Sequence, residues 1–402
     1  MQEHPSRRSF LKKAALAGSG VVLGAAGLNE LSPKIWPEPI VFEPNQSYWA
    51  KSQPPQNPPL AENLTADVVV LGGGFTGLSS AYFIRTLSRQ KRVVLLEANG
   101  CGNGASGRNG AMVLNLTDDR YMQLGPDPAV DKRIYDLTAR NIQTLSKLSA
   151  ITGIDCELET NGALQVLNTS NDVRDAQLYV QAARAAGMPV EFWNKQQVAS
   201  AIGTGLYEGA FFDPNGGHIH PMKLVQVWKA AAQSVGAEIY ENTVVTHIEE
   251  GPQNLVHTMN GFSVKAKSLV LATNAFTSRL GYFRNSIVPV HEYVAMTPPL
   301  SDHQVAQIGW PRRAPFNDNR TEVIYLGLTR DNRIHIGGGS PGYFFNNGVG
   351  DPNESVRHYA YLQRELVRVY PALEGVEFEA LWSGIVDWVP QRGALRGAHR
   401  KI

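Results

Sequence analysis

The chain has 402 residues, of which 43% are hydrophobic and 18% are charged, and its formal net charge is +1. This composition excludes an intrinsically disordered chain, and the lack of a basic excess argues against a nucleic-acid-binding protein, because binding to phosphates needs many Lys and Arg side chains. The two cysteines, Cys101 and Cys156, are too few for a disulfide framework or a metal cluster, and we expect both to be unpaired apolar side chains.

Residues 1–30 are typical of a twin-arginine signal peptide. Arg7 and Arg8 stand in the run S-R-R-S-F-L-K-K, and a mildly apolar segment follows from Ala14 to Leu28. This segment is shorter than the ~20 apolar residues that a membrane span needs, and it suits the hydrophobic region of a signal peptide that is cleaved after Ala26. We therefore expect the twin-arginine export machinery as a partner and a location in the periplasm or on the outer face of the cytoplasmic membrane. A basic amphipathic N-terminus is the alternative.

A proline-rich lead-in, residues 31–65, follows this segment. Prolines recur through it without a helical or strand period, which indicates an extended chain. We expect folded structure to begin near Ala66.

The next stretch predicts a strand, a tight glycine turn and a helix. The apolar run from Ala66 to Leu71 ends in G-x-G-x-x-G, and Leu78 to Gln90 has a helical period. In such a unit the first glycine makes the turn, the second lets the backbone approach a pyrophosphate and the third lets helix and strand pack closely. The glycines concerned are Gly72, Gly74 and Gly77.

A second buried strand, Arg92 to Glu97, ends in an acid that stands 20 residues after Gly77. A carboxylate at this point can accept hydrogen bonds from both ribose hydroxyls of an adenosine. Strand, helix, second strand and acid thus follow one another at the spacing that is typical of a dinucleotide-binding unit. They predict a dinucleotide site. A glycine-rich turn without a ligand is the alternative.

A second glycine-rich stretch, residues 99–111, cannot form a regular element and must turn repeatedly or lie close to a ligand. The sequences D-V-V-V-L-G-G-G-F-T-G-L-S, L-L-E-A and G-A-S-G-R-N-G together resemble the FAD-dependent D-amino-acid oxidase family, nearest to its glycine oxidase and gamma-glutamylputrescine oxidoreductase members. The resemblance implies an α/β protein with a Rossmann-like FAD-binding domain of the glutathione-reductase type and an interleaved α+β substrate domain that contains an antiparallel sheet.

The same resemblance implies which residues lie beside the cofactor. The glycine turn and the acid after the second strand would hold the adenosine diphosphate, the loop at 105–110 would run beside the flavin, and three later turns would return to the dinucleotide. The implied cofactor-binding residues are Gly72, Gly74, Phe75, Thr76, Gly77, Glu97, Ala98, Ser106, Gly107, Arg108, Asn109, Gly110, Val245, Ala272, Thr273, Asn274 and Gly338. No His stands in the loop where some relatives attach the flavin, so we expect non-covalent FAD.

The remainder of the chain predicts helices at 129–150, 173–186, 222–235 and 353–370 and paired strands at 155–167. Strands at 237–249 and 255–275 would return to the nucleotide sheet. With the family pattern, this divides the chain into a FAD-binding domain of residues 66–120, 205–275 and 333–402 and a substrate domain of residues 121–204 and 276–332. His218 and His220 have no further ligand in view, so no metal site is expected.

The run from Ile287 to Met296 alternates like a strand, which places His291, Tyr293 and Ala295 on one face and Glu292 and Val294 on the other. The run from Glu322 to Leu328, which contains Tyr325, also alternates like a strand. We predict His291, Tyr293 and Tyr325 as pocket-lining catalytic candidates. An ordinary solvent or interface face explains them as well.

The run W-x-G at Trp382 and the run D-x-x-P-x-x-G ending at Gly393 match the family, and the sequence then departs from it. A short polar run stands where the relatives have a strand, a G-x-x-G-x-G loop and a closing helix. The activity implied by the family is oxidation of a C–N bond in an amine or amino acid, with hydride transfer to flavin N5 and hydrolysis of the imine. Oxygen is the implied electron acceptor. Two alternatives stay open: a dehydrogenase that passes electrons to a quinone or a carrier, and a C-terminally truncated, catalytically inactive remnant.

Overall fold

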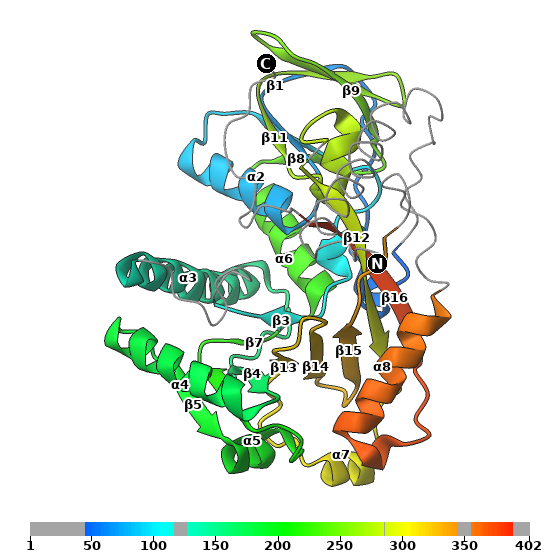
Figure 1. The fold of residues 1–402 in the computed structure, drawn as a ribbon. Coiled ribbons are helices and arrows are strands. Elements are labelled where there is room, and N and C mark those ends of the chain that lie inside the picture. The colour runs from blue at the N-terminus through cyan, green and yellow to red at the C-terminus, as the bar shows by residue number, and fades with distance from the viewer. Residues whose placement is uncertain (1–44, 116–126, 285, 344–354, 389–402) are drawn as a thin grey trace, which may run out of the picture.

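The computed structural model describes residues 45–115, 127–284, 286–343 and 355–388. The predicted signal segment at 1–30, the first part of the lead-in and the predicted departure from the family pattern after Gly393 lie outside the described residues. Two large sheets organise the chain, one in the upper and one in the lower part of Figure 1.

The upper sheet has six strands in the order β8-β2-β1-β11-β10-β9. Its first four strands are parallel, and β9 and β10 join them as an antiparallel meander. The strands are β1 (Leu64–Leu71), β2 (Val93–Leu96), β8 (Glu238–Tyr240), β9 (Val245–Glu249), β10 (Asn254–Thr258) and β11 (Ser263–Leu271). The predicted returns at 237–249 and 255–275 are therefore confirmed. The helices α2 (Phe75–Leu87) and α6 (Pro221–Ser234) pack on one face through an apolar core that β1 and β2 share.

The lower sheet has eight strands in the order β16-β12-β15-β14-β13-β4-β6-β5. All neighbours are antiparallel except β13 and β4. The strands are β4 (Ala163–Leu167), β5 (Glu191–Asn194), β6 (Gly209–Asp213), β12 (Val288–Met296), β13 (Phe316–Asp318), β14 (Ile324–Leu328), β15 (Ile334–Gly338) and β16 (Ala380–Trp388). A two-stranded ribbon of β3 (Met112–Val113) and β7 (Gly217–His218) is a third, separate pairing.

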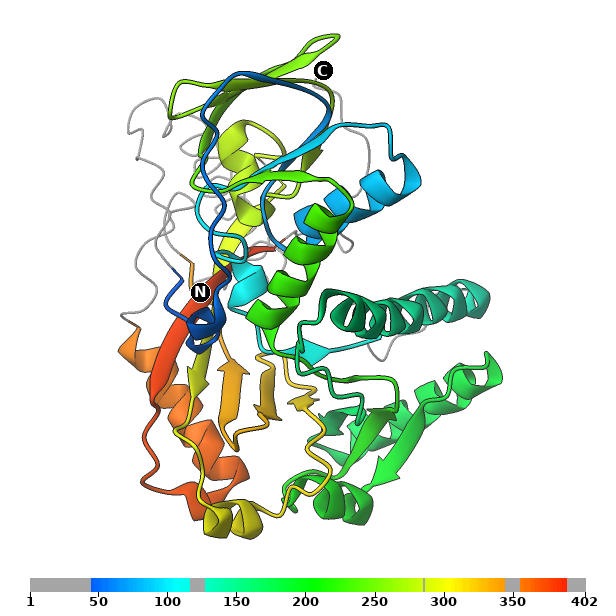
Figure 2. The same ribbon diagram turned by 180° about the vertical axis from the view of Figure 1, so that it is seen from behind.

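Helices cover both faces of the lower sheet. On one face lie α5 (Lys195–Ile202), α7 (Asp302–Ile308) and α8 (Val356–Val369), whose apolar side chains share one core with the strands. On the other face, α3 (Pro128–Thr152) and α4 (Ser170–Ala185) cover the end that carries β6. Figure 2, seen from behind, shows α3 and α4 side by side, away from α8. The remaining face of β12, β14, β15 and β16 is turned toward the upper sheet.

The predicted fold class is confirmed, while the predicted division into domains stays a prediction. Residues 333–402 were assigned to the FAD-binding domain, whereas β15 and β16 are strands of the lower sheet. The same holds for β6, which lies inside the predicted segment 205–275. Alternating apolar residues show that a segment is a strand, but they do not show which sheet it joins, because pairing partners lie far away in the sequence.

Two local predictions also need correction. Of the strands expected over 155–167, only β4 forms, while Glu159 makes a single bridge to His218. Within the lead-in, a 3-10 helix, η1 (Tyr48–Ser52), forms well before Ala66, and its Trp49 is 1% exposed. The folded part of the chain therefore includes the end of the proline-rich segment.

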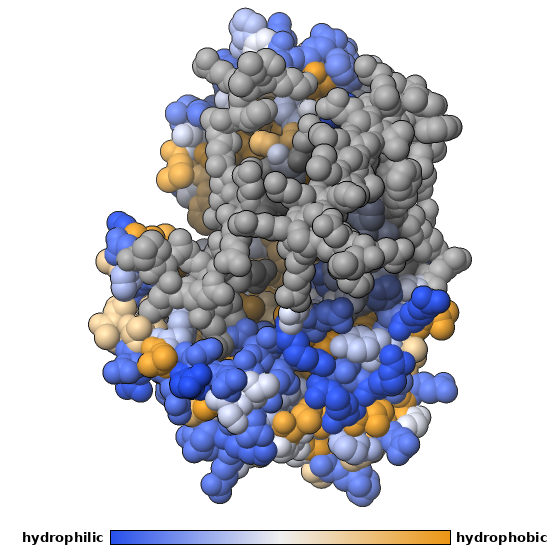
Figure 3. All heavy atoms as spheres, viewed as in Figure 1, coloured by the Kyte–Doolittle hydropathy of each residue, from blue (hydrophilic) through white to orange (hydrophobic). Residues whose placement is uncertain are grey.

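The surface of the described part is polar on the face shown in Figure 3, where apolar residues are scattered singly over the lower sheet's half. Among the residues that the structure describes, no helix combines the length and apolar character needed to cross a membrane. Cys101 and Cys156 are buried and unpaired, as expected.

Candidate active site

The glycine turn between β1 and α2 brings backbone segments into very close contact. A Cβ atom on Gly72, whose φ is +105°, would lie 2.4 Å from the carbonyl oxygen of Ala272. A Cβ atom on Gly77 would lie 1.8 Å from the carbonyl oxygen of Gly72. Only glycine fits at these two positions, so β1, α2 and the end of β11 meet without side chains between them.

The N-terminus of α2 carries open hydrogen-bond donors. The N–H of Phe75 donates to the hydroxyl of Ser106 over 2.9 Å, whereas the N–H groups of Gly74 and Thr76 have no partner among the described residues. Unpaired N–H groups and the positive end of the helix dipole form a seat for an anion. The residues present therefore fit the pyrophosphate of a dinucleotide.

Glu97 spans the same turn from the end of β2. Its carboxylate accepts hydrogen bonds from the N–H of Gly73 over 2.6 Å and from the N–H of Asn99 over 3.0 Å. Burial raises the pKa of Glu97, and these backbone donors oppose that rise. Ala98 follows it, half-buried. Val245 begins β9, two residues beyond Thr243, whose N–H donates to the backbone oxygen of Glu97. The predicted adenosine residues thus lie around one end of the upper sheet.

The loop at 105–110, which begins with η2 (Ala105–Gly107), runs from this turn to the lower sheet. Ser106 contacts the start of α2, as described above. Two residues later, Arg108 donates through Nη1 to the carbonyl oxygen of Ser383 in β16, and its own carbonyl oxygen accepts from the indole N–H of Trp382 over 2.8 Å. A single short loop therefore joins the dinucleotide turn to the sheet of the substrate domain.

The 3-10 helix η1 holds the same loop from the other side. Ser47 Oγ donates to the carbonyl oxygen of Gly107 over 2.8 Å, and the indole N–H of Trp49 donates to that of Asn109 over 3.0 Å. Asn45 Nδ2 also donates to Gly107, over 3.1 Å. We name residues 45–52 the N-terminal clasp.

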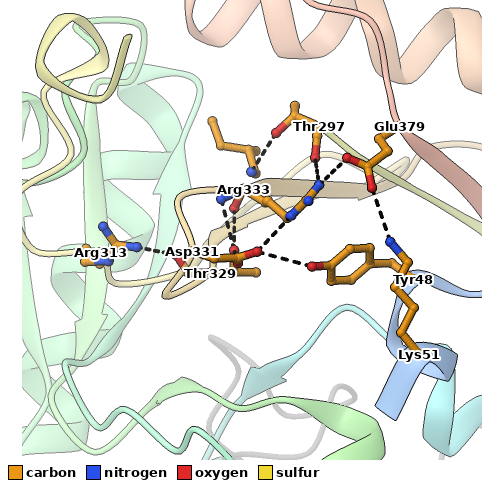
Figure 4. Close-up of polar contacts among 9 residues, drawn as sticks. Tyr48, Lys51, Thr297, Arg313, Thr329, Asp331, Arg333 and Glu379 are labelled. Atoms are coloured by element: carbon orange, nitrogen blue, oxygen red, sulfur yellow. Dashed lines mark hydrogen bonds and ion pairs between the residues drawn. The ribbon is translucent and has the colours of Figure 1, made fainter. Parts of the chain in front are cut away.

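The clasp is fixed to the lower sheet by the polar network drawn in Figure 4. Tyr48 donates its hydroxyl proton to Asp331 over 3.2 Å, and Lys51 pairs with Glu379 over 3.2 Å. Arg333 lies between the two acids, 2.8 Å from Asp331 and 2.6 Å from Glu379. The clasp therefore connects the lower sheet to residues 105–110, which we name the flavin loop after their predicted place beside the cofactor. No pattern in the lead-in indicated this role.

Tyr325, in β14, lies at the junction between the lower sheet and the loop at 105–110. Its ring lies over Gly337 and beside Gly110, since a Cβ atom on either glycine would come within 2.2 Å of it. Burial and then the negative charge of Glu292 raise the pKa of Tyr325 well above its ordinary value. Of the three catalytic candidates, Tyr325 is the one that the structure brings next to the flavin loop.

His291 and Tyr293 lie elsewhere. The predicted alternation along β12 is correct, but the face that carries both residues packs on α8, where the Tyr293 ring stacks on His358 with centroids 3.9 Å apart. The opposite face, with Glu292 and Val294, is turned to the junction. His291 and Tyr293 therefore lie on the other face of the sheet from Tyr325. Periodicity gives the two faces of a strand but not which one is turned to a ligand.

The later residues that were predicted to contact the dinucleotide, Ala272, Thr273, Asn274 and Gly338, make contacts with different parts of the structure. Ala272 lies against Gly72, and Thr273 bonds to Thr277 over 2.8 Å. Asn274 reaches β16, donating to the carbonyl oxygen of Ile385 over 3.2 Å. Position 338 requires a glycine, Gly338, for a structural reason, because a Cβ atom there would lie 1.9 Å from the carbonyl oxygen of Val323.

A buried histidine pair lies near the clasp. The Nε2 atoms of His218 and His335 are 3.0 Å apart, and the Trp49 ring lies edge-on to His335. Burial lowers the pKa of His218 to about 3 and that of His335 well below its ordinary value. Both rings are therefore neutral at pH 7, and one donates a hydrogen bond to the other. Among the described residues, no group of three His, Cys, Asp or Glu is placed to hold a metal ion.

Comparisons with known proteins agree with this geometry. Residues 67–401 match the model of the family described as FAD dependent oxidoreductase. Gamma-glutamylputrescine oxidoreductase of Escherichia coli is 29% identical over 368 residues, which are 88% of this chain and 82% of that protein. Glycine oxidase of Geobacillus kaustophilus is 25% identical over 332 residues, which are 79% of this chain and 80% of that protein.

The fold is also found among solved structures. Glycine oxidase from Geobacillus kaustophilus superposes with a TM-score of 0.67 at 23% identity, covering 82% of this chain and 84% of that one. L-proline dehydrogenase from P. horikoshii gives the same TM-score at 19% identity, covering 82% and 83%. The similarity therefore extends over both sheets.

Proposed function

The chain belongs to the family of FAD-dependent oxidoreductases, and from this premise we propose that it oxidises the C–N bond of an amine or amino acid. The observation that carries the proposal is the loop at 105–110. It contacts the dinucleotide turn through Ser106 and β16 through Arg108, so one segment holds the cofactor site and the substrate sheet together.

Residues of the glycine turn, of β2 and of β14 would bind the cofactor and the substrate in this reaction. The open N–H groups of Gly74 and Thr76 would hold the pyrophosphate, and Glu97 would exchange its backbone partners for the ribose hydroxyls. Bound FAD supplies the electron sink for hydride transfer. Tyr325, over Gly337, lies where it can orient the substrate with its hydroxyl, which makes no hydrogen bond to any described residue.

The names of the relatives support an amine as substrate. One is an oxidoreductase of gamma-glutamylputrescine, and others are oxidases of glycine and, in a subunit from Rhodobacter capsulatus, of sarcosine. These substrates share an oxidisable C–H bond next to nitrogen. The electron acceptor is oxygen or a quinone, and stopped-flow reoxidation of the reduced protein by oxygen separates the two.

Anaerobic reduction of the bound flavin tests the proposal. The purified protein is saturated with FAD and mixed with a panel of amines, N-methyl amino acids and amino acids, and the absorbance near 450 nm is followed. Bleaching by at least one of them is the expected result. A protein that stays colourless after incubation with FAD, or that no member of the panel reduces, would contradict the proposal.

We also propose that the twin-arginine segment directs export of the folded protein. The support is the sequence alone, from Arg7 and Arg8 to the apolar run. Export of a fusion in cells that lack the twin-arginine machinery is the test, with Arg7→Lys and Arg8→Lys together as the variant. Unchanged export in either case overturns the proposal.

A further inference from the structure

The strand β16 lies at the edge of the lower sheet, because among the described strands it pairs only with β12. Figure 2 shows it in red, running from the outer edge of the lower sheet toward the upper half of the molecule. In an antiparallel pair, alternate residues turn their backbone groups toward the partner strand and away from it. Half of the N–H and C=O groups of β16 therefore point away from β12 and are open to other partners.

Three of these outward groups are bonded by side chains from outside the lower sheet. Arg108 Nη1, in the flavin loop, donates to the carbonyl oxygen of Ser383 over 3.2 Å. Asn274 Nδ2 donates to the carbonyl oxygen of Ile385 over 3.2 Å, and Asn274 Oδ1 accepts from the N–H of Asp387 over 3.0 Å. Residues 383, 385 and 387 follow the alternation of a strand, so the three bonds lie along one edge.

The side-chain amide of Asn274 takes the place of one residue of a neighbouring strand. In a parallel pair, a residue donates its N–H to one residue of the adjacent strand, and its carbonyl oxygen accepts from the residue two positions further on. Asn274 makes the same two bonds, to Ile385 and Asp387. Because one partner is an acceptor and the other is a donor, the orientation of the amide is fixed, and both its nitrogen and its oxygen are bonded to β16.

The backbone brings this amide close to the dinucleotide turn. Asn274 begins η4 (Asn274–Leu280), and its φ is +47°, in the left-handed region that asparagine tolerates better than most side chains. Two residues earlier, the carbonyl oxygen of Ala272 lies where a Cβ atom on Gly72 would come within 2.4 Å of it. Only Thr273 therefore stands between the contact with the dinucleotide turn and the contact with β16.

This link matters for the proposed reaction, because hydride transfer needs a close and fixed approach of the reacting atoms. A misplacement of about 1 Å can slow a reaction about 10²-fold. The upper sheet would hold the cofactor and the lower sheet the substrate, so the rate depends on how firmly the two sheets are held together.

We propose that Asn274 is a positioning residue, which fixes the edge of β16 relative to the dinucleotide turn, and that its side chain is not a ligand of FAD. The inference rests on the proposed oxidation of an amine. It gives Asn274 a different role from the cofactor binding that the family resemblance implies for it.

The test compares the FAD-loaded wild type with Asn274→Gly and Asn332→Gly. Glycine removes the amide and accepts the positive φ. Asn332 is a matched control, because it also has a positive φ, +61°, and its side chain accepts a hydrogen bond from Arg313 over 3.0 Å in the turn between β14 and β15.

Three quantities are measured for each protein. The first is the Kd of FAD, from fluorescence titration. The second is the rate of anaerobic flavin reduction, by a saturating amine that reduces the wild type and, separately, by dithionite, which does not need the substrate sheet. The third is backbone hydrogen exchange at Asp387 and at Val386, which lies opposite Val290 and turns its N–H toward β12.

In Asn274→Gly we expect reduction by the amine to slow at least fivefold, while the Kd of FAD and the rate of reduction by dithionite stay within twofold of the wild type. Exchange at Asp387 should become at least tenfold faster, whereas Val386 keeps its protection. Asn332→Gly should behave as the wild type in each measurement. A loss of stability without a change in positioning would not separate the amine from dithionite.

Three results overturn the inference: reduction by the amine that slows less than fivefold in Asn274→Gly, a Kd of FAD that rises as much as the rate falls, or unchanged exchange at Asp387. If Asn274→Gly does not fold, Asn274→Asp replaces it, because aspartate can still accept from Asp387 but cannot donate to Ile385, and the same loss of rate is expected. If no amine reduces the wild type, the proposed function fails, and exchange at Asp387 alone then decides whether Asn274 holds the edge of β16.

Discussion

The indole N–H of Trp49 donates a hydrogen bond to the carbonyl oxygen of Asn109 over 3.0 Å. This contact joins a residue from the proline-rich lead-in to the loop that connects the dinucleotide turn with the substrate sheet. The geometry of the cofactor site therefore depends on a segment that lies outside the G-x-G-x-x-G unit and precedes it in the chain.

Replacing Trp49 by Phe keeps an aromatic ring next to His335 and removes the N–H donor. The carbonyl group of Asn109 then loses a buried partner, which costs about 1–3 kcal/mol. We expect the free energy of unfolding to fall by that amount and FAD to bind several-fold more weakly, as measured by denaturant unfolding and by flavin fluorescence titration. Tyr48→Phe, which removes a partly exposed hydroxyl from the same helix, should have a smaller effect. Equal effects of the two variants would argue against the clasp as a support for the loop.

Gly77→Ala should abolish FAD binding. The added Cβ atom would lie 1.8 Å from the carbonyl oxygen of Gly72, so the turn cannot close on α2. Gly104→Ala, just before the flavin loop, is the control, because a Cβ atom there meets nothing within 4 Å. The absorbance spectrum of the purified variants reports the bound flavin. A yellow Gly77→Ala protein with normal affinity would contradict the assigned turn.

The buried ion pair of Lys229 and Glu241 should be needed for folding. Nζ of Lys229 and Oε2 of Glu241 are 2.5 Å apart, and their side chains are 5% and 0% exposed, respectively. The Glu241 carboxylate also accepts a hydrogen bond from the N–H of Cys101. Glu241→Gln leaves the buried lysine without its counter-charge, which costs about 3–5 kcal/mol. Glu238→Gln breaks the more exposed pair with Arg92 and should cost about 0–1 kcal/mol. Chemical unfolding of both variants measures the difference, and similar costs would refute the role of burial.

Stability should fall in acid through the buried histidine pair. The pKa of folded His218 is about 3, below the ordinary value of 6.5. Below pH 6.5 the unfolded chain binds a proton at this position and the folded chain does not, so folding loses about 1.4 kcal/mol per pH unit as the pH falls from 6.5 toward 3. Between pH 7 and pH 5 the contribution of His218 is therefore about 2 kcal/mol.

His218→Asn should reduce that loss, measured as the change in the free energy of unfolding between pH 7 and pH 5. His303→Asn, at an exposed position of α7, serves as the control and should keep the wild-type pH dependence. A His218→Asn protein whose stability falls between pH 7 and pH 5 as steeply as that of the wild type would contradict the assignment.

Much of the fold could be predicted, and the misses have a common cause. The strand-turn-helix at Gly72 to Gly77, the meander after β8 and the helices α3, α4 and α6 follow from local periodicity and are confirmed within a few residues. The membership of β6, β15 and β16 in the lower sheet could not be predicted, because sheet partners are chosen over long distances in the sequence. The alternation along β12 is confirmed, but only the tertiary structure shows which of its two faces packs on α8.

The amino-acid sequence by itself determined the dinucleotide turn. The three glycines and the acid lie at fixed spacing within one β-α-β unit, so the geometry of the turn depends only on residues that are close together in the chain. It also determined, through resemblance, the family and its cofactor. Only the tertiary structure decided that Tyr325 meets the flavin loop while Tyr293 packs on α8, that Glu292 is turned to the junction, and that Trp49 holds Asn109. Each of these relationships joins residues that are far apart along the chain, and a residue's neighbours in space are set by how sheets and helices pack.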